Sequence, residues 1–258
     1  MGATKEKLLR TLDILKTTDE QHPITTAKII EQLREYGLEP ERKSVLRDIK
    51  LLRDYGSDNA DMDKSLTDRA LEYAVKAHAG QTRKGTSIPY IVHPVEVMKI
   101  VAGITGDEEV RAAAVLHDTK EDAGATPEEL AELFGDRVSK LVCAESEDKR
   151  EDRPEKETWR IRKQETLDHV EHADRDVKII CLGDKLANMR DIARDFKAVG
   201  DDLWTRFNAP EDGKGIEGKK TNIGWYYRGI ADRLKDELGQ TAAWKELDGL
   251  VAEVFGMM

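Results

Sequence analysis

Several features that define other protein classes are rare or missing in this sequence. Only two cysteines occur, Cys143 and Cys181, and both stand among apolar residues without a CxxC pattern. We therefore expect reduced thiols in the core rather than a disulfide or a zinc site. No apolar run approaches the ~20 residues with which a helix crosses a bilayer, and the amino-terminal residues lack the pattern of a secretory signal. These absences predict a cytoplasmic protein without a membrane partner.

Aromatic residues are also scarce, at 5% of 258 residues, whereas charged residues make up 36%. The net charge is −10, so the chain is acidic overall. This composition is typical of a soluble protein with long amphipathic helices, and the helical spacing of its apolar residues predicts an all-α fold. The length suits one large domain or two modest ones.

Three short apolar stripes at helical spacing mark the first part of the chain. They consist of Leu8, Leu12 and Leu15, of Ile29, Ile30 and Leu33, and of Val45, Ile49 and Leu52. Thr25 or Thr26 can cap the second helix, and Gly37 can end it. Three short helices with a tight turn before the third are the pattern of a helix-turn-helix.

The same segment resembles the N-terminal DNA-reading module of WYL-type transcription regulators in LLRTLDILK and in ERKSVLRDIKLLRDYG. We interpret residues 1–57 as a three-helix helix-turn-helix module and residues 58–64 as a short polar linker. The main domain then covers residues 65–258.

Three basic residues, Arg42, Lys43 and Arg47, lie off the apolar stripe of the third helix, where they would meet phosphates and base edges of DNA. Residues 1–58, however, carry 11 Lys plus Arg and 11 Asp plus Glu, whereas a dedicated DNA binder has a basic surplus. No hairpin that would form a wing follows Tyr55. A dimerisation or docking module therefore stays open as the alternative.

An apolar helical run ends in a histidine and a cluster of carboxylates in the stretch AAAVLHDTKEDAG. His117 and Asp118 can point toward one place, and Glu121 and Asp122 return to the same side one turn later. Imidazole nitrogens and carboxylate oxygens suit Mn, Fe, Zn or Mg, and a divalent cation relieves the repulsion among the carboxylates. On these residues alone, a solvated and charged helix end is the alternative.

Two further segments supply donor groups of the same kind. His78 stands in AVKAHAGQTRKG, and His93 stands in IPYIVHP. Downstream, Asp184 lies in the apolar run VKIICLGDKLANMRDI. Burying its charge there is costly unless it binds a metal or pairs with a cation, for which Lys185 and Arg190 are candidates.

The order His93, His117–Asp118 and Asp184 resembles the HD superfamily of metal-dependent phosphohydrolases. Three local sequences, HAGQTRKGTSIPYIVHP, AAAVLHDTKEDAGATPEELAELFGDRVSKLV and LGDKLANMRDI, resemble the hydrolase domain of the RelA/SpoT homologue family, and their spacing is most similar to its small metazoan type. The resemblance implies a helical hydrolase domain with a C-terminal helical extension. It also implies removal of the 3′-pyrophosphate from the stringent-response alarmone (p)ppGpp.

The resemblance further implies roles for individual residues. Mn²⁺ would be held by His93, His117, Asp118 and Asp184. Glu121 and Asp122 would then be free to position or deprotonate a water. The residues that would bind the substrate are Arg83 against the base, Lys84 near a phosphate, Asn188 on the ribose or a phosphate, and Lys185.

Two segments further downstream carry basic, histidine and aromatic residues. The run WRIRKQE, which includes Lys163, begins a helix whose basic side would attract a pyrophosphate near a metal site; a solvated face is the alternative. His169 and His172 lie three residues apart on this helix, and without a third ligand nearby we expect a surface pair. Near the C-terminus we expect aromatic rings such as Trp204 to pack between helices.

Two other functions stay open. Lys120 stands where relatives usually have an apolar residue, so the substrate could be a related nucleotide, such as an adenosine alarmone or the 2′-phosphate of NADPH. The non-enzyme alternative is a transcription regulator in which the HD pocket senses an alarmone. Its N-terminal module would then bind DNA, or a second copy of the chain in a homodimer.

Overall fold

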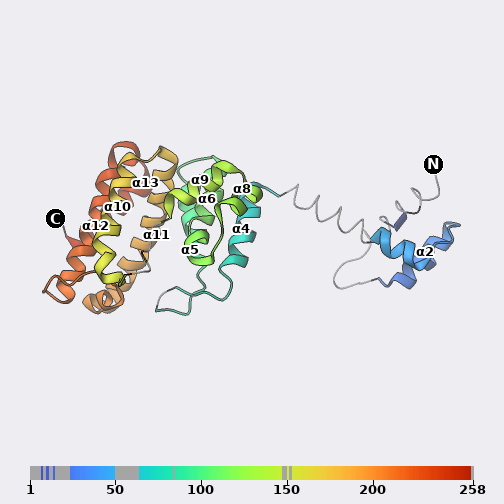
Figure 1. Ribbon diagram of the computed structural model, residues 1–258, viewed down its shortest axis with the longest axis horizontal. Helices are drawn as coiled ribbons and strands as arrows, with labels where there is room; N and C mark the ends of the chain where they lie inside the picture. The colour runs from blue at the N-terminus through green and yellow to red at the C-terminus, as the bar shows by residue number, and fades with distance from the viewer. Residues whose placement is uncertain are drawn as a thin grey trace. The chain divides into compact units, whose positions relative to one another are not determined.

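The protein forms two compact helical units, Met1–Ser65 and Leu66–Met258 (Figure 1). The computed structural model describes residues 7, 10, 11, 14, 24–49, 64–83, 85–146, 150 and 153–256. Over these residues the regular structure is helical apart from one isolated bridge between Thr82 and Pro89, so the predicted all-α fold is confirmed. None of the described helices is both long and apolar enough to span a membrane.

Some predicted features lie outside the described residues. They are Lys84, most of the predicted linker, and the apolar positions Leu8, Leu12, Leu15 and Leu52. The domain boundaries at 57 and 64 therefore stay a prediction.

The amino-terminal unit contains α2 (Thr26–Glu35) and a further helix over 42–49. Thr25 caps α2 by accepting a hydrogen bond of 3.3 Å from the backbone N–H of Lys28. Gly37 follows with φ at 74°, a left-handed conformation in which glycine ends a helix without strain. The buried apolar residues of this unit are Ile14, Ile29, Leu33 and Val45.

The helix over 42–49 exposes the three basic residues that were predicted to contact DNA, Arg42, Lys43 and Arg47. On its other side Asp48 is buried, and its carboxylate lies 3.0 Å from Nζ of Lys7. This ion pair ties the helix to the first part of the chain. Because exposed basic residues on a small helical unit are compatible with many roles, the helix-turn-helix and its DNA contacts stay predictions.

The second unit begins with shorter helices and continues with longer ones (Figure 1). The shorter helices are α4 (Leu66–Ala77), α5 (Val92–Ala102), α6 (Glu108–Leu116), α7 (Thr119–Ala123), α8 (Pro127–Phe134) and α9 (Asp136–Glu145). The following elements are α10 (Glu155–His172), α11 (Arg175–Val199), the 3₁₀ helix η1 (Gly200–Arg206), α12 (Ile216–Leu238) and α13 (Ala242–Phe255). Helix α11 is central, because it packs against α5 and α6 from the first group and against α12 and α13 from the second.

Gly183 lets α11 approach α5 closely. A Cβ atom at this position would lie 2.9 Å from Cγ2 of Val101 and 3.3 Å from the backbone oxygen of Val97. Because such distances are too short for a well-packed core, a larger residue would push the helices apart. The close contact keeps Asp184, the next residue in the chain, within reach of His93 on α5.

A group of charged residues fixes the start of α6. Asp107 caps the helix by accepting hydrogen bonds from the backbone N–H groups of Glu109 and Val110, at 3.0 and 3.4 Å. Arg137 of α9 donates to Asp107 at 2.9 Å and to Asp176 of α11 at 2.7 Å. The guanidinium holds the pKa of Asp107 below its ordinary value of 3.8. The same arginine thus links α6, α9 and α11.

Trp204 of η1 joins the C-terminal elements. Its fully buried ring has centroid distances of 5.5 Å to Phe196 of α11 and 5.4 Å to Phe255 of α13. The indole N–H donates a hydrogen bond of 3.0 Å to Asp201. The expected packing role of Trp204 is confirmed.

Candidate metal centre

Four predicted donor residues meet where α5, α6 and α11 come together. His93 lies in the first turn of α5, and Asp184 lies near the middle of α11. His117 and Asp118 occupy the junction between α6 and α7. Nε2 of His93 is 3.1 Å from Oδ1 of Asp184, and Nε2 of His117 is 3.1 Å from Oδ2 of Asp118. The structure therefore brings all four side chains together.

The orientation of His117 leaves one ring nitrogen facing the other donors. Its Nδ1 lies 2.9 Å from the carbonyl oxygen of Ala114, so the ring N–H donates there. Its Nε2 is buried and faces Oδ2 of Asp118 at 3.1 Å and Oδ1 of Asp184 at 3.7 Å, but it does not form a well-directed hydrogen bond with either. This is the arrangement of a metal-binding histidine, whose second nitrogen is fixed by a backbone carbonyl.

The donor set fits a divalent cation. Donor atoms of His93, His117 and Asp184 all lie within 4.8 Å of one another. Oδ2 of Asp118 is 3.6 Å from Nε2 of His93, which places it at the edge of the same group. Two imidazoles and two carboxylates suit Mn, Fe or Zn, and an ion among them would provide the missing partner of the His117 nitrogen.

Burial and charge oppose each other at this centre. Burial alone would lower the pKa of His117, but Asp118 and Asp184 outweigh it and raise that pKa well above its ordinary value. Burial alone would raise the pKa of Asp184, but Lys185 and the imidazoles outweigh it and lower that pKa well below its ordinary value. The Asp184 carboxylate is therefore ionised, which is the state that binds a cation, whereas a cation bound at Nε2 of His117 would have to displace the proton that the raised pKa favours there.

Tyr90 connects the donor group to the predicted catalytic pair. Its hydroxyl donates to Oδ2 of Asp118 at 2.7 Å and lies 3.1 Å from Oδ2 of Asp122. Burial and the neighbouring carboxylates raise the pKa of Tyr90, so the hydroxyl stays protonated. Sequence reasoning missed this residue, although it stands in PYIVHP, three residues before His93.

Gln81, which follows α4 in the chain, also contacts the segment that carries Glu121 and Asp122. The side-chain N–H of Gln81 donates to the backbone oxygen of Asp122 at 2.8 Å. Oε1 of Gln81 is 2.8 Å from Nδ1 of the buried His78. His78 therefore positions Gln81, and it is not one of the converging donor residues.

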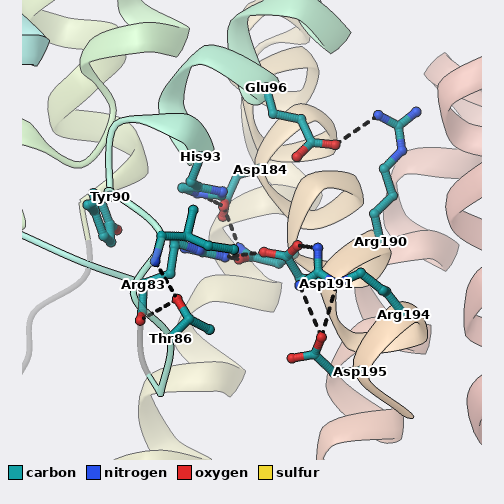
Figure 2. Close-up of polar contacts among 12 residues, drawn as sticks. Arg83, Thr86, Tyr90, His93, Glu96, Asp184, Arg190, Asp191, Arg194 and Asp195 are labelled. Carbon is teal, nitrogen blue, oxygen red and sulfur yellow. Dashed lines mark hydrogen bonds and ion pairs between the residues drawn. The ribbon is translucent and has the colours of Figure 1, made fainter. Parts of the chain in front are cut away.

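Three of the predicted substrate-binding residues form a connected chain beside the metal ligands, and Figure 2 shows Arg83 near Asp184. Lys185 pairs with the carboxylate of Asp184. Nδ2 of Asn188 donates to Oδ1 of Asp184 at 2.6 Å. Arg83 donates to Oδ1 of Asn188 at 2.8 Å and to Oδ2 of Asp191 at 3.0 Å. Lys84, the fourth predicted residue, lies outside the described residues.

The prediction that Arg190 pairs with Asp184 was wrong. Arg190 instead donates to Glu246 at 2.7 Å and, as Figure 2 shows, to Glu96, at 3.1 Å. Positions six apart on a helix point about 120° away from each other, so Arg190 faces the neighbouring helices and not Asp184.

Two cavities meet at this place. The first, which we call the metal cavity, has a volume of about 280 Å³ and is lined by the four donor residues together with Glu121 and Asp122. The second, the adjoining cavity, has a volume of about 480 Å³. Both are lined by Arg83, Tyr90, His93, Lys163, Lys185, Asn188 and Tyr226. Together they offer space for a nucleotide beside the metal ligands.

Helices α9 and α10 complete the metal cavity. Lys163 of α10 lines it, on the helix whose basic side was expected to act near the metal site. His169 and His172 are both exposed, as the predicted surface pair requires, and His169 also lines this cavity, which sequence reasoning missed. Glu145, at the end of α9, also lines it, and burial raises the pKa of this carboxyl group to about 8. The places of Lys163 and His169 in the cavity depend on how α10 crosses α11, and a local sequence motif does not indicate this crossing.

A family profile described as HD domain matches residues 70–214. The chain belongs to the HD-domain family. The match covers α5, the junction between α6 and α7, and α11, which carry the four donors of this HD domain, and the amino-terminal unit lies outside it.

Within the HD domain the chain is similar to proteins named guanosine-3′,5′-bis(diphosphate) 3′-pyrophosphohydrolase MESH1. The protein from Danio rerio is 36% identical over 127 residues, which are 48% of this chain and 67% of that protein. The protein from Xenopus tropicalis is 38% identical over 136 residues, which are 51% of this chain and 72% of that protein. The solved structure of a metazoan orthologue of SpoT that hydrolyses ppGpp superposes with a TM-score of 0.59 at 26% identity, covering 75% of this chain and 98% of the other.

Proposed function

We propose that the HD domain is a metal-dependent hydrolase that removes the 3′-pyrophosphate from the guanosine alarmone (p)ppGpp. The observation that carries this proposal is the meeting of His93, His117, Asp118 and Asp184 beside a nucleotide-sized cavity. The names of the MESH1 relatives and of the SpoT orthologue favour this substrate over other phosphoesters.

Mn²⁺ is the proposed ion. A divalent cation bound here would polarise a phosphoryl oxygen and activate a water for attack. The side chains of Glu121 and Asp122 line the same cavity without belonging to the close donor group, so they are placed to orient that water and take its proton. The hydroxyl of Tyr90 holds Asp118 and Asp122 in fixed relative positions.

The adjoining cavity would hold the nucleoside. Its walls carry the rings of Trp159, Phe207 and Tyr227, which provide an apolar surface for a base. Arg83 lies at the junction with the metal cavity, where its planar guanidinium can stack on a purine or bind phosphate. The proposed roles of Lys185 and Asn188 are to contact the phosphate or ribose near Asp184, and Lys84 is proposed to join them.

The proposal is tested by incubating the purified protein with ppGpp and Mn²⁺ and measuring pyrophosphate release. We expect release by the wild type and its loss in His117→Ala, whereas His172→Ala, an exposed histidine of α10, keeps wild-type activity. A panel that includes an adenosine alarmone and NADPH compares the alternative substrates. No release from ppGpp by the wild type would remove the function.

For the amino-terminal unit we keep DNA binding as the proposal. It is supported by the exposed row of Arg42, Lys43 and Arg47 on the helix over 42–49. A mobility-shift assay with and without ppGpp tests it, and the three Ala variants should abolish any shift. Loss of self-association in the same variants, without any DNA shift, would favour the homodimer instead.

A further inference from the structure

The α10 wall of the metal cavity differs chemically from the walls that carry the predicted catalytic residues. Asp118, Glu121 and Asp122 line it from the α7 side, and Glu145 lines it from α9. Helix α10 contributes Lys163, Thr166, His169 and Val170 to the lining, and none of these is a carboxylate. A multiply charged anion is therefore repelled by the carboxylates of the α7 wall and attracted toward α10.

Lys163 stands at the junction of the two cavities. Its Nζ lies 5.1 Å from the ring centroid of Tyr226, and Nζ of Lys185 lies 5.9 Å from the same centroid. Both lysines and Arg83 line both cavities. A phosphate chain that reaches from a nucleoside in the adjoining cavity to the metal ligands would pass these three cations.

His169 lies six residues after Lys163 on α10 and lines the metal cavity but not the adjoining one. An imidazole can donate an N–H in either protonation state. The hydroxyl of Thr166, between the two, already donates to the backbone oxygen of Arg162 at 3.0 Å. The groups of α10 that are placed to bind a phosphate are therefore Nζ of Lys163 and the ring of His169.

We propose that Lys163 and His169 form a subsite for the outer phosphate of a 3′-diphosphate, and so for the pyrophosphate that is released. This inference rests on the proposed function and refines it, because it assigns the inner phosphate to the metal centre and the outer one to α10. It follows that the domain distinguishes a diphosphate from a monophosphate through α10.

The experiment is calorimetric titration of the full chain in Mn²⁺ with sodium pyrophosphate and, separately, with orthophosphate. We expect the wild type to bind pyrophosphate more tightly than orthophosphate. Lys163→Ala and His169→Ala should each weaken pyrophosphate binding about tenfold, the size expected for one lost charge-assisted hydrogen bond. Lys163→Arg should restore most of the affinity, because it restores the charge.

Two matched variants on the same helix serve as controls. Lys156→Ala and His172→Ala remove an exposed lysine and an exposed histidine that line neither cavity, so their pyrophosphate affinity should equal that of the wild type. Mn²⁺ binding measured in each variant reports whether the centre is still folded.

Two results distinguish failure of the proposed phosphate subsite from failure of the proposed hydrolase function. Wild-type hydrolysis of ppGpp with unchanged pyrophosphate affinity in both Lys163→Ala and His169→Ala would overturn the subsite and leave the hydrolase intact. Absence of both ppGpp hydrolysis and pyrophosphate binding in the wild type would instead remove the proposed function and the subsite with it.

Discussion

The hydroxyl of Tyr90 donates a hydrogen bond of 2.7 Å to Asp118. This contact and the 3.1 Å approach to Asp122 make one side chain the support of both a proposed metal ligand and a proposed catalytic base. Such supports around a metal matter almost as much as the ligands, because they fix the orientation of the carboxylates.

Tyr90→Phe should therefore lower ppGpp hydrolysis and Mn²⁺ affinity by about tenfold or more while leaving the fold intact. Activity and Mn²⁺ titrations measure the two effects. Tyr73→Phe is the control, since that ring packs against Phe134 at 5.5 Å, outside both cavities. Equal activity of Tyr90→Phe and the wild type would show that the hydroxyl has no positioning role.

Gly183→Ala should destabilise the protein by about 1–3 kcal/mol, because the new Cβ would overlap Val101 and Val97 at 2.9–3.3 Å. Gly249→Ala on α13 is the matched control, because a Cβ there meets nothing within 4 Å. That change should stabilise the protein by up to about 1 kcal/mol through helix propensity. Urea unfolding measures both, and equal stabilities of the two variants would contradict the close contact of α5 and α11.

Asp107→Asn should reduce stability by about 0.5 kcal/mol near neutral pH, a small value because the Arg137 pair is partly exposed. Asn keeps the helix cap, so only the charge is tested. Because the folded-state pKa of Asp107 is lowered below 3.8, its contribution is complete above that value and is lost as the pH falls through the folded-state pKa. Urea unfolding at pH 7 and at acidic pH measures the difference in unfolding free energy between the wild type and Asp107→Asn. This difference should shrink at the lower pH, and a constant difference would argue against the ion pair.

Mn²⁺ should raise the melting temperature of the wild type by several degrees, because a ligand at about 100 times its Kd adds ~2.7 kcal/mol to folding. Asp184→Asn should abolish this increase, and Asp236→Asn, an exposed aspartate of α12, should preserve it. Chelation with EDTA should reverse the increase in the wild type. An identical increase in Asp184→Asn would place the ion elsewhere.

The gathering of His93, His117, Asp118 and Asp184 could be expected from the sequence because each stands in a short motif whose order is distinctive. Tyr90 could have been found as well, since it precedes His93 by three residues on the same turn. Whether the four residues bind Mn²⁺, and whether Glu121 and Asp122 act on water, stay predictions.

His169 and Glu145 could not be assigned to the site in advance. They lie on α9 and α10, and their place in the metal cavity depends on how these helices cross α11. Helix crossing depends on many side chains at once, so a local pattern such as the His169–His172 spacing gives no distance to a third element.

The hydrogen bonds from Arg83 to Asn188 and from Asn188 to Asp184 connect the adjoining cavity to a proposed ligand of the ion. A nucleotide that binds the Arg83 guanidinium would compete with Asn188 for it. Because Asn188 also donates to Asp184, this competition would affect the carboxylate that is proposed to bind the ion. Linkage then requires that nucleotide and cation change each other's affinity by the same factor. Under the proposed function, a nucleotide in the larger cavity would therefore also change how tightly the ion binds.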